Sequence, residues 1–64
     1  MDEFSTADGQ LVELRQIIDE AGRPLLRVKI IDGSKFRHFD VDAATAGAIA
    51  AALALWADAA PRRE

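Results

Sequence analysis

Residues 42–60 read DAATAGAIAAALALWADAA, and this stretch predicts a helix of about five turns. Eleven of its residues are Ala, the best helix former. Asp42 is a preferred N-cap residue, and Pro61 follows at a position where a helix could not continue. We therefore expect one long helix over residues 42–60.

This helix lacks a polar face. Between Ala43 and Ala60 its only charge is Asp58, whereas a surface helix ordinarily has one apolar and one solvated side. A helix that is apolar nearly all round is expected to be covered on more than one side. One side has residues at i, i+3, i+4 and i+7 spacing and is expected to lie on the rest of the domain: Ala46, Ile49, Leu53, Trp56 and Ala60. Among them, Trp56 is expected to anchor the core.

The opposite side of the helix carries small residues at four-residue spacing, which would allow a second helix to approach closely. A glycine inside a helix costs about 1 kcal/mol relative to Ala unless something uses the missing side chain, and Gly47 is such a glycine. The alternative is that this Ala-rich surface is simply exposed, as much of any protein exterior is apolar. The candidate assembly interface consists of Gly47, Ala48, Ala51, Ala54, Leu55 and Asp58.

The 64 residues predict one small domain near the lower size limit for unaided folding. There is no cysteine, so no disulfide or thiolate metal site can stabilise it. At this size, burial and conformational entropy nearly cancel, and oligomerisation is one ordinary remedy. We expect a mobile lead-in over residues 1–10, a sheet over 11–41, the helix over 42–60 and a tail over 61–64.

The segment 11–19 is compatible with a helix or a strand. The turn at residues 20–24 and the alternating, β-branched segment 25–31 favour a hairpin. The predicted fold is therefore α+β: a three-stranded antiparallel β-meander followed by one long C-terminal helix packed on one sheet face (βββα). The runner-up is αββα.

Turn chemistry predicts the register of the second hairpin, and the sorting of apolar residues onto one face predicts that of the first. Gly33 and Ser34 fit a two-residue type II′ turn, which places Asp32 opposite Lys35. The same register pairs Val28 with Phe39, Leu26 with Val41, Arg27 with Asp40, Lys29 with His38, and Ile31 with Phe36. For the first hairpin, the predicted partners of Leu14, Gln16 and Ile18 are Ile30, Val28 and Leu26.

Residue types used in catalysis are present, but their placement argues against a site. His38, Asp40 and Asp42 alternate as on one face of a strand, yet Asp42 is better explained as the helix cap and Asp40 as the partner of Arg27. Ser34 belongs to a turn and does not form a hydrolytic triad with His38 and Asp40 by default. No phosphate-binding glycine loop or zinc spacing is present. We expect no catalytic residue, no metal site and no cofactor.

The outer sheet face is a second candidate surface. Arg15, Lys29 and His38 are expected to form one row there, which could contact phosphates of a nucleic acid or dock another protein. Against nucleic acid stand the net charge of −3, the isoelectric point of about 5.0, and the interruptions at Glu13 and Asp40. The candidate partner face consists of Arg15, Arg27, Lys29, Phe36, Arg37 and His38.

These patterns together predict a small non-catalytic accessory or interaction protein. Its expected partner is itself, as a homodimer or higher oligomer, with another protein as an alternative. Nucleic-acid binding through the outer sheet face is a second alternative, and an enzyme site shared between subunits is a weaker one. The acidic N-terminus lacks the features of a signal peptide, and the uncharged run 43–57 is shorter than a membrane span, so we expect a cytoplasmic protein without membrane contact.

Overall fold

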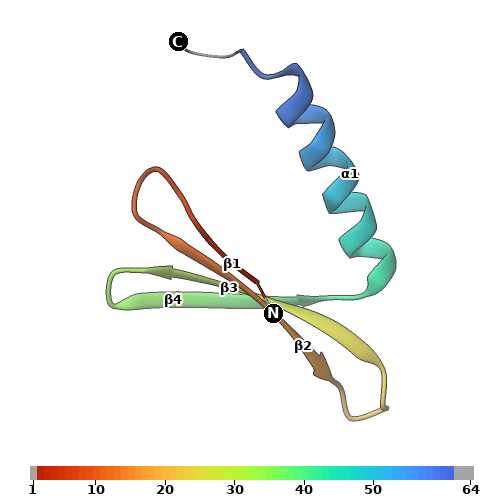
Figure 1. The fold of residues 1–64 in the computed structure, drawn as a ribbon. Helices are drawn as coiled ribbons and strands as arrows, with labels where there is room; N and C mark the ends of the chain where they lie inside the picture. Colours follow the sequence, from red (N-terminus) through yellow and green to blue (C-terminus); the bar gives the residue numbers. More distant parts are fainter. Residues whose placement is uncertain (1, 62–64) are drawn as a thin grey trace.

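The computed structural model describes residues 2–61, which form four strands and one helix. The strands are β1 (Asp2–Ser5), β2 (Leu11–Ile18), β3 (Pro24–Asp32) and β4 (Lys35–Val41), and the helix is α1 (Ala43–Ala59). Figure 1 shows one antiparallel sheet in the order β1-β2-β3-β4, followed by the helix. The predicted α+β class with a C-terminal helix is confirmed. The alternative αββα order is wrong, because residues 11–18 form a strand.

The prediction of three strands is wrong because β1 adds a fourth. Residues 2–5 belong to the predicted mobile lead-in, but they pair with β2 and place Phe4 opposite Val12. A three-residue loop joins the two strands: the Thr6 amide donates to the Gln10 carbonyl at 2.8 Å, and Gly9 has φ of 88°. Glycine is favoured at this left-handed position of a three-residue hairpin loop. Although β1 has few apolar residues, the hairpin forms because the residues of the turn strongly favour it. Met1 lies outside the described residues.

The loop between β2 and β3 has the same construction. The Asp19 carboxylate accepts hydrogen bonds from the amides of Ala21 at 2.9 Å and Arg23 at 2.8 Å, and from Arg23 Nε at 2.7 Å. Gly22 has φ of 81° and occupies the left-handed position. Asp19 and Arg23 therefore close a three-residue loop, in which Asp19 satisfies the backbone amides that face it.

This loop changes the register predicted for the first hairpin. Leu14 pairs with Val28 rather than Ile30, Gln16 with Leu26, and Ile18 with Pro24. The prediction was therefore wrong by two residues. Because side chains alternate along a strand, a two-residue shift leaves each one on its predicted face.

The register of the second hairpin is confirmed in full. Leu26 pairs with Val41, Val28 with Phe39, Arg27 with Asp40, Lys29 with His38, Ile31 with Phe36, and Asp32 with Lys35. In the two-residue loop, Gly33 has φ of 63° and Ser34 has no positive φ, as in a type II′ turn.

The helix begins and ends close to the predicted bounds. The Asp42 carboxylate accepts a hydrogen bond from the Thr45 amide at 2.9 Å, which is the expected N-cap interaction. The helix ends at Ala59, before Pro61. Residues 62–64 of the predicted tail lie outside the described residues.

The helix does not lie flat on the sheet. It rises from the end of β4 and diverges from the strands toward its C-terminal end (Figure 1). None of residues 2–61 is buried, and along the helix Leu53 is 63% and Trp56 71% exposed. The prediction that Trp56 anchors a core is therefore wrong for the single chain. A helix joined to β4 through Asp42 alone has no loop with which to fold back over the sheet.

Candidate assembly site

An open apolar cleft separates the helix from one face of the sheet. Its volume is about 310 Å³. It is lined by Phe4, Val12, Leu14, Leu26, Val28, Phe39 and Val41 from the sheet, and by Ala46, Ile49, Ala50 and Leu53 from α1. All eleven residues are apolar, and alternation along the strands gathers the seven sheet residues on one face. The cleft is the surface that would form a hydrophobic core if it were covered.

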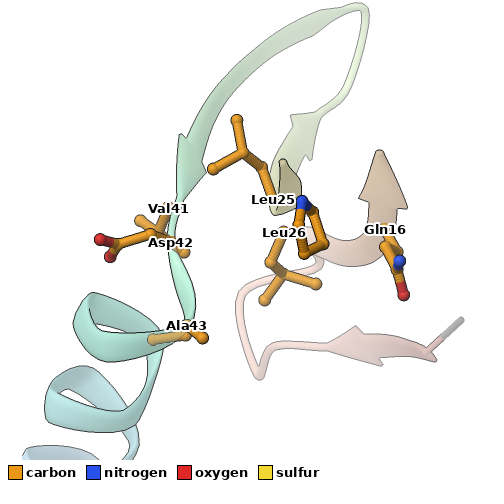
Figure 2. A pocket seen from close by; sticks show the side chains of 8 residues that line it. Gln16, Leu25, Leu26, Val41, Asp42 and Ala43 are labelled. Carbon is orange, nitrogen blue, oxygen red and sulfur yellow. The ribbon is translucent and has the colours of Figure 1, made fainter. Parts of the chain in front are cut away.

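A second hollow of about 210 Å³ adjoins the cleft where α1 leaves the sheet. Figure 2 shows Val41, Asp42 and Ala43 on the helix side of this hollow, with Leu26 and Gln16 across from them. Leu26, Val41 and Ala46 line both the hollow and the cleft, so the apolar surface is continuous between them. Pro24 and Leu25 complete the rim of the hollow.

The predicted assembly interface lies on the part of α1 that does not line the cleft. Its six residues, 47, 48, 51, 54, 55 and 58, are all exposed, and Leu55 is 73% exposed. A Cβ placed on Gly47 would meet nothing within 4 Å. Nothing packed in the single chain therefore requires a glycine at this position. Of the predicted sheet-facing stripe, Ala46, Ile49 and Leu53 do line the cleft.

The outer face of the sheet carries charged residues in two rows. One row joins Glu13, Lys29 and His38, and the next joins Arg15, Arg27 and Asp40. The predicted row of Arg15, Lys29 and His38 does not exist, because the two-residue register shift brings Glu13 beside Lys29. Alternation also places Arg37, the partner of Ile30, on the apolar face, away from the other candidate residues.

Ion pairs neutralise much of the positive charge on this face. Arg27 binds Asp40 through two hydrogen bonds of 2.9 and 3.2 Å, which lower the pKa of Asp40. Arg15 lies 3.7 Å from Glu13, and Lys29 Nζ lies 4.7 Å from the centre of the Phe36 ring. The arrangement is a mixed-charge surface rather than a basic patch.

The residues considered for catalysis or metal binding have other partners. Asp40 pairs with Arg27, and hydrogen bonds from the Thr45 side chain and amide lower the pKa of Asp42. Within residues 2–61, no three His, Cys, Asp or Glu side chains are grouped closely enough to hold a metal ion. The surfaces that stand out are apolar ones, in the cleft and along α1.

A protein-family model matches residues 1–59 of the chain, and its description is a family of unknown function, DUF6967. The chain belongs to this family. The match runs from before β1 to the last residue of α1, so the DUF6967 model covers every described strand and the helix. No curated protein and no solved structure matches the chain. Across the described part of the DUF6967 chain, no helix combines the length and apolarity needed to cross a membrane.

The sheet half of the cleft is the part that sequence reasoning did not identify as a site. Phe4 was assigned to the lead-in, although it lines the cleft and is 54% exposed. The signal that could have found it is the Asp8-Gly9 pair, a common hairpin turn. The openness of the cleft has no local sequence signal, because it depends on the angle between α1 and the sheet.

Proposed function

We propose that this DUF6967 protein is a non-catalytic accessory or interaction module that works as a homodimer or higher oligomer, with α1 as the assembly element. The observation that carries the proposal is the lack of any buried residue among residues 2–61. Apolar burial is the dominant favourable term in folding, and here a single chain supplies little of it. Association would provide the missing burial, and we propose that the module is cytoplasmic because its acidic N-terminus lacks the features of a signal peptide.

Gly47 supports the choice of α1. A helix-interior glycine is unfavourable, and nothing within the chain fills the space that its missing side chain leaves. The backbone of a second chain could use this space by approaching closely. Ala51 and Ala54 also have small side chains, so they extend along the helix the surface that a partner could approach closely.

Sedimentation velocity on Gly47→Leu, with Gly47→Ala as the matched control, tests this proposal. Both variants should raise the helix propensity of the monomer. If a second chain packs closely against Gly47, Leu should weaken association strongly, and Ala should do so less. Equal sedimentation of both variants and the original protein would contradict the interface. Because folding is expected to be linked to association, unfolding of Gly47→Leu should be reversed at higher protein concentration; unfolding at every concentration would show that this side of the helix is needed within the chain.

A second candidate function is nucleic-acid binding through the outer sheet face. It is favoured by Phe36, which is 60% exposed and carries Lys29 over its ring, as a base-stacking residue beside a phosphate contact would. A mobility shift with single-stranded probes tests it. Binding that weakens steeply with salt and is lost in Phe36→Ala would support the candidate, and no shift at low salt would exclude it.

A further inference from the structure

We propose that the cleft between α1 and the sheet is filled by helix α1 of a second copy, so that each helix completes the core of the partner. This inference rests on the proposed self-association and specifies its geometry. The predicted packing of α1 on a sheet face would then occur between chains rather than within one.

The chemistry of the cleft restricts its occupant. All eleven lining residues are apolar, so a charged or strongly polar segment would lose its hydration without gaining partners. The occupant must therefore be an elongated apolar element.

The α1 helix of a second copy meets this requirement. It is about 25 Å long and has Asp58 as its single charged residue. Its own apolar side chains are exposed, with Leu53 at 63%, Leu55 at 73% and Trp56 at 71%. Each copy thus has both an apolar cleft and an uncovered apolar helix, and a two-fold arrangement would satisfy both at once.

The exposed area is sufficient for such a dimer. The chain exposes 5604 Å², whereas a compact monomer of 7.0 kDa exposes about 4,000 Å². Covering the excess on both copies would bury about 3,200 Å², within the range of about 2,000–5,000 Å² typical of obligate homodimers.

The dimensions of the chain favour interlocked copies over copies placed side by side. Its radius of gyration is 14.0 Å, whereas a compact chain of this length has about 11 Å. A compact body of two such chains would have about 14 Å, no more than one chain has now. In a dimer that is this compact, the centres of the two chains would nearly coincide, and entry of each copy into the cleft of the other would achieve this.

The link between β4 and α1 disfavours closure of the helix onto its own sheet. Asp42 is the whole connection, with φ of −80° and ψ of 173°, and its carboxylate caps the helix. Rotating α1 onto its own sheet would change these two dihedral angles and disturb the hydrogen bond between Asp42 and the Thr45 amide. Entry of a partner helix leaves the connection unchanged.

Disulfide trapping tests the inference directly, because the chain has no cysteine of its own. Val28→Cys places a thiol in the cleft, and Leu55→Cys places one on the side of α1 that turns away from its own cleft and would therefore meet the sheet of the partner. The two single variants are mixed, unfolded, refolded together and oxidised, and the mixed dimer is measured by intact mass. The matched control is the pair His38→Cys and Leu55→Cys, because His38 lies on the outer face of the sheet.

We expect the mixed Val28–Leu55 disulfide to exceed the control pair several-fold. A mixed yield equal to the control, with Ala51→Cys linking efficiently to itself, would overturn cleft filling but leave self-association through α1 intact. A Val28→Cys, Leu55→Cys double variant that links only within one chain would also overturn it. If no pair links and the mass is that of one chain, both this inference and the proposed function fail.

Discussion

At the scale of single residues, the carboxylates of Asp19, Asp40 and Asp42 accept hydrogen bonds at three different positions in the fold. The first organises the β2–β3 loop, the second pairs with Arg27 across β3 and β4, and the third caps α1. Hydrogen bonds from these partners lower the pKa of each carboxyl below 3.8. All three are solvent-accessible, so their shared consequence is the pH dependence of stability rather than a large energy from any one of them.

We predict that stability falls on acidification. A carboxyl with a lower pKa in the folded state contributes stability that is fully present above its unfolded pKa. That contribution is lost as the pH falls through 3.8 toward the folded-state values. Urea unfolding should give constant midpoints from pH 6 to 8 and lower ones near pH 3.5. In an Asp19→Asn, Asp40→Asn, Asp42→Asn variant this decrease should be smaller; an unchanged decrease would assign the effect to other groups.

We also predict that Gly22→Ala destabilises the protein by about 1 kcal/mol. A Cβ there would meet nothing within 4 Å, so the cost comes from the backbone at φ of 81° and not from a clash. Ser34→Ala, in a turn position without positive φ, is the control and should change stability by less than about 0.5 kcal/mol. Denaturant unfolding measures both, and equal effects would contradict the explanation.

At the scale of elements, the features that depend on local interactions could be predicted from the sequence. The bounds of α1 follow from its Ala content, Asp42 and Pro61, and the β3–β4 register follows from a two-residue loop that begins with Gly33. The β2–β3 register was missed because Asp19 closes a shorter loop than expected, through bonds that its residue type alone does not reveal. Strand β1 has few apolar residues, so it lacks the alternating pattern that indicates a strand. The sequence signal for its hairpin is the Asp8-Gly9 pair.

The angle of α1, and therefore the open cleft, could not be predicted from the sequence. The stripe of Ala46, Ile49 and Leu53 was correctly assigned to the side facing the sheet. Periodicity identifies a face of a helix, but it does not determine how far the helix lies from the sheet or which chain covers it.

For β1, we predict that Phe4→Ala weakens assembly without preventing the β1–β2 hairpin. Phe4 lines the cleft, so its truncation removes apolar area that a partner would cover. Ser5→Ala, one residue along β1 and on the opposite face, is the control and should leave assembly unchanged. Sedimentation equilibrium measures the dissociation constant of each variant. An equal effect of the two changes would mean that β1 contributes only through its backbone.

At the scale of the whole molecule, the sheet and the helix form an open structure in which none of residues 2–61 is buried. Its extents are 48 × 30 × 16 Å, and the apolar surfaces of the sheet and helix face a common cleft. A single chain in this form leaves exposed the surface that would ordinarily stabilise it. Folding and association are therefore expected to be linked.

This linkage predicts that thermal stability depends on protein concentration. For a dimer that unfolds to monomers, each tenfold increase in concentration shifts the balance by about 1.4 kcal/mol toward the folded dimer. Circular dichroism melts should therefore move to higher temperature as concentration rises. In Gly47→Leu, the midpoint should be lower at each concentration. A midpoint independent of concentration would indicate that one chain folds unaided.

The measurement that most directly tests self-association is molar mass by light scattering across a dilution series. We predict a mass of at least two chains, which is 14.0 kDa for a dimer of 7.0 kDa chains. This mass should persist on dilution until folding is lost. A folded species of 7.0 kDa at every concentration would contradict it.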